Sequence, residues 1–343
     1  MKSQQSFKYV FLVLLGILIL CFILNLSLGS VSIPLDEIFS SLLGGSTEKS
    51  TWHYIIIEYR LPKALTAICV GSGLGVAGLL MQTLFRNPLA GPFVLGLSSG
   101  ASLGVAFLIL GAGAFGGVLT QVLIGEWSLV FASAFGSFLV LLAVLALTFK
   151  VRDTMALLII GLMFGSLTSA LVAVLSYFSN AEKLQQYVFW SFGSLGNQSW
   201  KGVSILGIGV IIGLFLAFRS SKSLNALLLG ENYAKSMGVR FKRTTFTIII
   251  ATSILAGTIT AFAGPIAFIG LAIPHLTRQW VTTANHTILI PAVLLLGAIV
   301  MLICDTVAQI PFSEQTLPIN AITSLVGAPV VIWLLVRKRK LLF

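Results

Sequence analysis

The feature that most constrains this chain is a series of apolar stretches, each about 20 residues long and almost free of charge. A helix of that length and composition crosses the roughly 30 Å hydrocarbon layer of a bilayer. Across 343 residues, 57% of the side chains are apolar and only 9% are charged, whereas ordinary soluble domains carry about 25% charged residues. The sequence therefore predicts an all-α integral membrane protein and excludes a soluble globule.

Charges and Gly/Pro breaks divide the chain into about ten expected spans, which form a single transmembrane domain over residues 1–343. The spans are expected near residues 9–28, 62–85, 94–112, 127–148, 155–178, 202–218, 244–263, 271–283, 287–305 and 317–336. The stretch 113–125 is apolar but Gly-rich and stays ambiguous. The first run is too long for a secretory signal and has no small-x-small cleavage site, so we expect it to be retained.

Lysines and arginines set the orientation of the spans. Lys2 and Lys8 place the N-terminus in the cytoplasm, and the basic tail at 337–340 requires the same side, so the number of crossings must be even. The short segment 271–283, whose start is marked by the helix breakers Gly264, Pro265, Gly270 and Pro274, is therefore counted as the tenth crossing. With ten spans, only five of the 21 lysines and arginines fall outside, namely Lys49, Arg60, Lys63, Lys183 and Lys201.

No catalytic constellation is visible in the sequence. There is no G-x-x-x-x-G-K-[ST] phosphate loop, and His53, His275 and His286 lie too far apart for metal-ligand spacing. The three cysteines, Cys21, Cys69 and Cys304, all lie within apolar runs, which predicts neither a disulfide framework nor a metal site. We therefore expect a chain that is not an enzyme and binds no cofactor or metal.

The formal charge of +11 does not predict nucleic-acid binding, because the basic residues lie beside apolar runs as they do in cytoplasmic loops. Asp305 is the one acid expected inside a span. Such a residue is a functional hypothesis by default, but its place at the outer end of 287–305 also fits a carboxylate that pairs locally. A proton-driven carrier usually needs a relay of such groups, and this chain offers none.

Small residues predict close helix packing in the second and third spans. Gly71 and Gly75 are four residues apart, and Gly96, Gly100 and Gly104 form a longer stripe on one helical face. These glycines either pack helices or, alternatively, let helices slide in a conformational cycle. A possible inverted repeat, typical of transporters, links Ala90-Gly91-Pro92 and Gly96-Leu97 with Ala263-Gly264-Pro265 and Gly270-Leu271.

The most informative polar segment lies between the sixth and seventh spans. Apolar and polar residues alternate there at roughly helical spacing, which predicts a short amphipathic cytoplasmic helix over 224–238 that Gly238 ends. Such a helix could lie on the membrane surface or fill a groove on a partner, and its short tethered form favours the partner. On the outer side, Arg60 and Lys63 could either anchor the helix end or attract an acidic protein.

A set of ordered motifs covers nearly the whole chain from about Gly29 onward. They are Arg60-Leu61-Pro62-Lys63, Gln82, Arg86-Asn87-Pro88-Leu89-Ala90-Gly91-Pro92, Gly96-Leu97-Ser98-Ser99-Gly100-Ala101, Trp190, Gly193-Ser194-Leu195, Leu224-Asn225-Ala226-Leu227, Leu229-Gly230-Glu231, Ala234, Gly238, Phe268-Ile269-Gly270-Leu271, Ile273-Pro274-His275, Arg278, Pro291, Gly297-Ala298, Asp305-Thr306 and Gly327-Ala328-Pro329. Together they resemble the FecCD family of ABC importer permeases, which carry iron-siderophores, haem and cobalamin.

The resemblance implies a type II ABC importer fold with ten helices, two inverted halves, both termini in the cytoplasm of a prokaryotic inner membrane, and a permease dimer. The second permease is expected to be an identical chain, with a sister permease as the alternative. Two copies of an ATP-binding subunit, which hold the ATP and Mg²⁺, and a periplasmic or lipid-anchored substrate-binding protein complete the implied assembly. Residues that match the family's coupling helices are Asn225, Leu227, Leu228, Gly230, Glu231, Ala234 and Gly238.

Arg60 and Lys63 match outer positions that grip the binding protein in the family. Lys63 replaces the usual Arg and loses its bidentate fork, and Gln309 stands where the family often has Arg. Glu314 could repel an acidic partner.

The rival hypotheses are an ion-driven carrier that works alone and a structural scaffold. The sequence does not specify the cargo. We expect the residues that line the transport pathway to lie in the span 155–178 and in the last span.

Overall fold

The computed structural model describes residues 2–45, 47–111, 126–150, 154–196, 198–311, 313 and 315–336. The ambiguous stretch 113–125, Glu314 and the basic tail at 337–340 lie outside the described residues. All secondary structure in the described part of the chain is helical.

The first helices are α1 (Lys2–Ser27), α2 (Leu35–Leu42), α3 (Ser50–Tyr54), the π-helix η1 (Ile55–Arg60), α4 (Leu61–Phe85), the 3-10 helix η2 (Pro92–Leu95), α5 (Leu97–Ile109), α7 (Glu126–Lys150) and α8 (Thr154–Tyr177). The chain continues with α9 (Ala181–Ser191), α10 (Trp200–Arg219), α11 (Ser221–Leu228), α12 (Glu231–Ser236), α13 (Phe241–Ala263), α14 (Ile269–Trp280), α15 (His286–Ala308) and α16 (Ile319–Val336).

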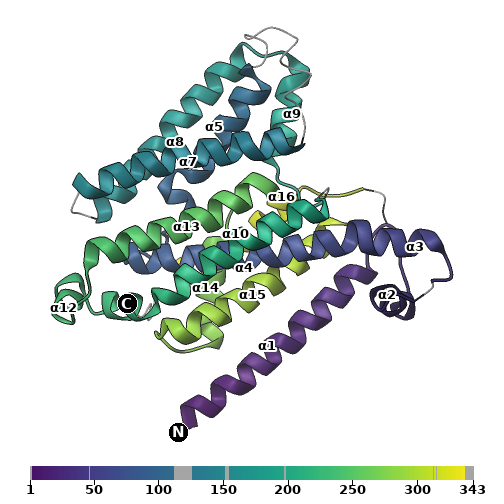
Figure 1. The fold of residues 1–343 in the computed structure, drawn as a ribbon, viewed down its shortest axis with the longest axis horizontal. Helices are drawn as coiled ribbons and strands as arrows, with labels where there is room; N and C mark the ends of the chain where they lie inside the picture. The colour runs from purple at the N-terminus through teal and green to yellow at the C-terminus, as the bar shows by residue number, and fades with distance from the viewer. Residues whose placement is uncertain are drawn as a thin grey trace.

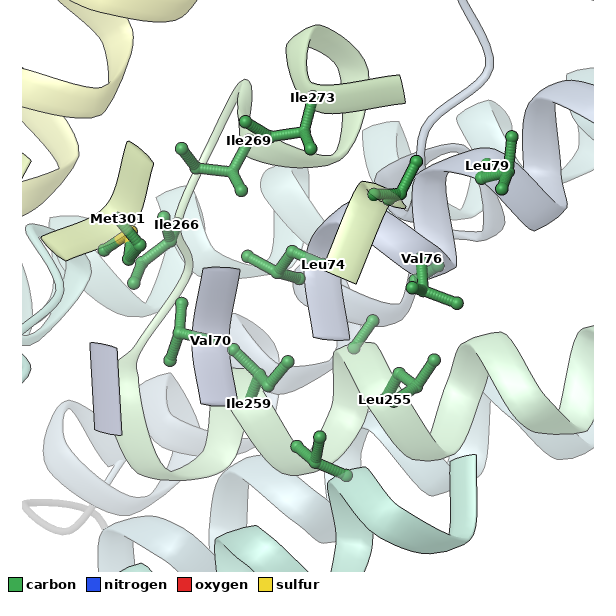
Figure 2. Close-up of a cluster of buried hydrophobic side chains, with 14 of the residues drawn as sticks. Val70, Leu74, Val76, Leu79, Leu255, Ile259, Ile266, Ile269, Ile273 and Met301 are labelled. Atoms are coloured by element: carbon green, nitrogen blue, oxygen red, sulfur yellow. The ribbon is translucent and has the colours of Figure 1, made fainter. Parts of the chain in front are cut away.

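Helix α4 lies at the centre of the molecule. It packs against α10, α13, α14 and α15, so almost all of its side chains are buried. Figure 2 shows Val70 and Leu74 of α4 among Ile259 of α13, Ile273 of α14 and Met301 of α15, each of them 0–1% exposed. A helix that is apolar on every side belongs in such a position, because it has no polar face to turn outward.

Two layers of helices are visible in Figure 1. Helices α5, α7, α8 and α9 form one group, and α4, α10, α14 and α15 form the other, with α13 between them in contact with α4 and α7. Helix α1 lies along α15 on the far side of the second group. Helices α2 and α3 lie at the end of the molecule opposite to α12.

Every expected span has a helix, although the ends differ by a few residues. Seven helical segments of the described chain are long and apolar enough to cross a membrane. Helices α5 and α16 are shorter, and the 12 residues of α14 span only about 18 Å. Each of these three helices is thus shorter than the roughly 30 Å hydrocarbon layer, and the crossing number of ten stays a prediction.

Helix α14 continues through Pro274, which the sequence marks as a break. Proline has no N–H for the carbonyl four residues earlier, and that carbonyl belongs to Gly270. The freed Gly270 carbonyl lies directly against Gly78 of α4, so closely that a Cβ on Gly78 would overlap it. The proline and the two glycines therefore form one close contact between α4 and α14.

The two segments of the expected inverted repeat are in contact. A Cβ on Gly270 would lie 2.7 Å from Pro92 Cδ, and one on Gly91 would lie 3.3 Å from the Leu271 side chain. His275 Nε2 lies 2.8 Å from the Pro88 carbonyl oxygen, which adds a polar link between the loop before η2 and α14. The first segment leads into α5 and the second into the first turn of α14, so the starts of these two helices meet here, and the inverted repeat itself stays a prediction.

Four helical segments are not predicted by the hydropathy pattern. Helix α2, helix α9 and the α3–η1 extension of α4 come before or between spans and carry polar residues. Asn180 caps the start of α9, because its side chain accepts a hydrogen bond from Lys183 N at 3.1 Å. These elements are short and amphipathic, so no 20-residue apolar window reveals them.

Candidate coupling segment and outer polar network

The segment 221–238 folds as two helices, where the sequence predicts one. Helix α11 ends at Leu228 and α12 starts at Glu231, because Gly230 adopts a φ of +114° that interrupts the helix. Gly238 has a φ of +83° and follows the end of α12, as expected. We call residues 221–238 the coupling segment.

One side of the coupling segment is packed into the protein. Leu224 and Ala234 are fully buried, and Leu227 is 4% exposed. Arg86, at the end of α4, donates from Nη2 to the Leu227 carbonyl oxygen at 2.7 Å, at the C-terminal end of α11. A cation at that end is favoured by the helix dipole. Leu227 and Ala234, expected among the coupling residues, therefore hold the segment to the protein instead of facing outward.

His286, the first residue of α15, joins three helices. Asn225 Oδ1 of α11 accepts a hydrogen bond from His286 N at 2.8 Å and lies 2.8 Å from His286 Nδ1. Since that oxygen is an acceptor, Nδ1 must carry the proton. Nε2 lies 2.9 Å from Thr83 Oγ1 of α4, whose hydroxyl also donates to the Leu79 carbonyl oxygen at 2.9 Å.

The sequence gives no indication of this role for His286. A single histidine next to an apolar run is read as an ordinary helix-end residue, and only the fold brings Thr83 and Asn225 to its two ring nitrogens. The neighbouring Asn285 caps α15 through Thr287 N at 3.0 Å and also accepts from Asn225 Nδ2 at 2.8 Å. Asn225 is thus bound to the start of α15 through both atoms of its amide.

The other side of the coupling segment carries exposed apolar side chains. Leu229 is 64% exposed, Tyr233 is 53% exposed and Met237 is 60% exposed. Glu231 and Lys235 form an ion pair of 2.7 Å, one helical turn apart, beside them. Leu228 is half-buried between the two sides. An apolar patch on a short polar segment is typical of a surface that binds a partner.

Helices α4 and α15 run together from the coupling segment to the opposite end of the molecule. In the middle, Gly71 and Gly297 approach so closely that a Cβ on either would overlap the carbonyl of the other. Ser72 Oγ donates to the Leu294 carbonyl oxygen at 3.0 Å. Gly75 also faces α15, 3.1 Å from Val293 Cγ1 when a Cβ is placed on it. These contacts make α4 and α15 one packed unit.

Asp305, near the far end of α15, is paired. Its side chain is 2% exposed, and Lys63 Nζ of α4 lies 3.1 Å from Oδ1. Asn25 of α1 and Gln309 each donate to Oδ2 at 2.9 Å. The buried charge is compensated from three elements, as buried carboxylates require. Of the two interpretations, the contacts support the local pair.

Arg60 is likewise held inside the protein. It is 8% exposed, and Nη1 donates to the carbonyl oxygens of Leu26 at 2.6 Å and Ser27 at 2.9 Å, while Nη2 donates to that of Val31. These carbonyls belong to the last turn of α1 and the loop after it. Arg60 therefore anchors the end of α1, and neither Arg60 nor Lys63 stands free as an outward charge.

A cleft of about 730 Å³ lies beside this polar network. Arg60, Lys63, Asp305 and Gln309 line one side, and Phe189 together with residues 192–196 lines another. The aromatic part of that wall comes from α9 and its end, which the sequence pattern does not reveal.

The glycine stripe of α5 faces α7. A Cβ on Gly100 would lie 2.6 Å from the Gly136 carbonyl oxygen, and one on Gly104 would overlap that of Ala132. Gly96 has a φ of +71° and starts α5.

Among the residues that the structure describes, no group of three His, Cys, Asp or Glu side chains could hold a metal ion.

The family model of the FecCD transport family matches residues 17–337. The chain belongs to this family. It is 34% identical to the hemin transport system permease protein HmuU of Yersinia pestis over 333 residues, which covers 95% of this chain and 96% of that protein. It is 33% identical to the vitamin B12 import system permease protein BtuC of Klebsiella pneumoniae, over 99% and 96% of the two chains.

Two further proteins extend the comparison. The molybdate import system permease protein MolB of Haemophilus influenzae is 33% identical over 95% of each chain. A solved structure of a metal-chelate type ABC transporter in an inward-facing conformation matches with a TM-score of 0.84 and 31% identity, over 97% of this chain and all of that one. This FecCD chain is therefore a multi-pass permease subunit of an ABC importer, and its fold class is as expected. The family implies an ATP-binding subunit and a substrate-binding protein.

Proposed function

We propose that this FecCD permease carries a metal chelate or corrinoid inward across a prokaryotic inner membrane, and that a separate ATPase drives it through the coupling segment. The cargo class is a siderophore complex, haem or cobalamin. The observation that carries the proposal is the two-sided coupling segment, which is bound to α4 and α15 on one side and exposes Leu229, Tyr233 and Met237 on the other.

The contacts suggest how motion would be transmitted. A partner that moves the exposed patch also moves Asn225, and with it the start of α15, while Arg86 couples the same segment to the end of α4. Because α4 and α15 are packed together as far as Lys63 and Asp305, the shift reaches the outer cleft. Differential contact with two states of the ATPase would then alternate access.

The remaining features of the assembly belong to the same proposal. Ten crossings place both termini in the cytoplasm, and the binding protein meets the outer face that carries the 730 Å³ cleft. Two identical permeases pair with two ATPase subunits. The permease itself binds neither ATP nor Mg²⁺ and catalyses no reaction, so all nucleotide chemistry takes place in the partner.

The test changes the exposed patch without changing its anchors. We expect Tyr233→Glu with Met237→Glu to abolish co-purification of the ATPase and ATP-dependent uptake in vesicles, because two charges would enter an apolar contact. Leu43→Glu, which places the same kind of charge on an 86% exposed leucine just after α2, is the control and should leave the assembly intact.

The uptake assay uses hemin, cyanocobalamin, ferrichrome and molybdate as separate cargoes, each with the binding protein present. Full assembly and uptake by the double variant would refute the proposed coupling surface. Uptake under an ion gradient without the ATPase would instead favour a carrier that works alone.

A further inference from the structure

A second cavity, of about 330 Å³, lies between α5, α8 and α9 and shares no lining residue with the outer cleft. Six of its eight described lining residues carry a hydroxyl group, and the other two are apolar. They are Ser98, Ser99 and Ser102 of α5, Thr168, Ser169 and Val172 of α8, Tyr187 of α9, and Pro265. A polar cavity of this size lies within the range of small-molecule sites.

The hydroxyl groups differ in how they are satisfied. Thr168 Oγ1 donates to the Gly165 carbonyl oxygen at 2.9 Å within its own helix. Tyr187 and Ser102 share a side-chain hydrogen bond, which partly offsets the rise that burial causes in the pKa of the Tyr187 phenol. Ser98 is 9% exposed, and its buried hydroxyl has no hydrogen-bond partner in the described structure.

An unpartnered buried hydroxyl is costly unless a ligand or water completes it. Other such hydroxyls occur, for example at Ser133 of α7, but Ser133 does not line this cavity. Ser98 and Ser99 stand in the first turn of α5, where backbone N–H groups lack helical partners and the helix dipole is positive. Both features favour oxygen atoms of a bound molecule.

We propose that this hydroxyl cavity is a polar subsite of the transport pathway that hydrogen-bonds the oxygen-rich face of a neutral chelate. The proposal rests on the proposed function. None of the described lining residues carries a charge, so an oxyanion would find no counter-charge there. Hydroxyls donate and accept with equal ease, so they can hold many oxygen arrangements, and their bonds are weak enough to release the cargo.

The first experiment measures access to the cavity in the full transporter. Ser99→Cys is labelled with N-ethylmaleimide in vesicles that contain the permease, ATPase and binding protein, and the unsubstituted chain controls for its three native thiols. We expect ferrichrome or cyanocobalamin, whichever these vesicles take up, to slow labelling about tenfold at ten times its Kd. Ser50→Cys, at the exposed start of α3, should label at an unchanged rate.

Three outcomes would overturn the proposal. Residue 99 could fail to label while residue 50 labels, it could label at an unchanged rate while a neutral chelate is taken up, or molybdate alone could protect it. In each of these cases, uptake of hemin, ferrichrome or cyanocobalamin in the same vesicles shows that the proposed function stands. Failure of ATP-dependent uptake for hemin, cyanocobalamin and ferrichrome, with or without uptake of molybdate, would overturn the proposed function itself, and the subsite with it.

The second experiment separates binding from structural support. Ser98→Ala removes a hydroxyl that bonds no protein group, so the thermal stability of the complex should not fall. We expect the half-saturating concentration for uptake of the neutral chelate to rise about 2- to 12-fold, the worth of one hydrogen bond. Ser133→Ala is the matched control and should change neither quantity. Unchanged half-saturation in Ser98→Ala would overturn the proposed contact.

Discussion

The histidine that joins the coupling segment to the spans can be tested one hydrogen bond at a time. His286 is fully buried, with Nδ1 2.8 Å from Asn225 Oδ1 and Nε2 2.9 Å from Thr83 Oγ1. An asparagine at this position offers an amide N–H near the place of Nδ1, and a glutamine reaches the place of Nε2. The backbone bond from residue 286 to Asn225 survives in both variants, so the two substitutions isolate the ring.

The expected magnitudes follow from these contacts. Loss of the Nδ1 bond removes about 0.5–1.5 kcal/mol from the link between α11 and α15, or about 2- to 12-fold in an equilibrium between two states. His286→Gln should lower cargo-stimulated ATPase activity by that factor and leave basal ATPase activity unchanged. His286→Asn should stay within about twofold of the unsubstituted protein, because it keeps the bond to Asn225.

The assay compares basal and cargo-stimulated ATP hydrolysis with uptake in the same vesicles. His53→Gln and His53→Asn, at an exposed histidine of α3, are the matched controls and should have no effect. If His286→Gln kept stimulation and His286→Asn lost it, the link would run through Thr83. If both variants behaved like the unsubstituted protein, the ring would contribute nothing to coupling and the argument would be refuted.

Two further predictions concern the packing of α4. Lys63→Met leaves the Asp305 carboxylate buried without its cation, so it should destabilise the purified permease by about 3–5 kcal/mol, and adding Asp305→Asn should restore most of that loss; equal melting temperatures for all three proteins would contradict the pairing. Gly78→Ala forces a methyl group against the Gly270 backbone and should cost more than about 1–3 kcal/mol, whereas Gly16→Ala, where nothing lies within 4 Å, should be neutral or slightly stabilising. Thermal unfolding and the yield of folded protein measure both, and a fully stable Gly78→Ala would show that α14 can move away from α4.

The expected spans have helical counterparts because a single requirement, a long apolar stretch that can be buried in the bilayer, determines where they occur. Each needs only a long apolar window, and the bilayer imposes that requirement locally along the chain. The same criterion does not detect helix α9 and the α3–η1 extension, because these helices are short and contain both polar and apolar residues. The bend at Gly230 also escapes it, because apolar spacing is nearly continuous across the two helices and only the glycine conformation separates them.

The site residues were harder to assign than the spans. Arg60 and Lys63 look like outward charges in the sequence, but their partners come from distant parts of the chain, the end of α1 and the end of α15. Charge type and spacing alone cannot distinguish an exposed cation from one that completes buried carbonyls. The motif around Asn225 marks this residue in the sequence, yet its contacts as an anchor depend on His286, 61 residues later.

The pairing of Lys63 with Asp305 has a consequence for synthesis. The lysine is synthesised long before the aspartate, so the ion pair can form only after α15 has been made. A truncated chain that stops before residue 286 would lack α15, so the Lys63 amine would have no carboxylate partner and the side of α4 that packs on α15 would be uncovered. An unpaired Lys63 amine would thus distinguish an unfinished chain from a complete one, and proteases or chaperones in the membrane could recognise it.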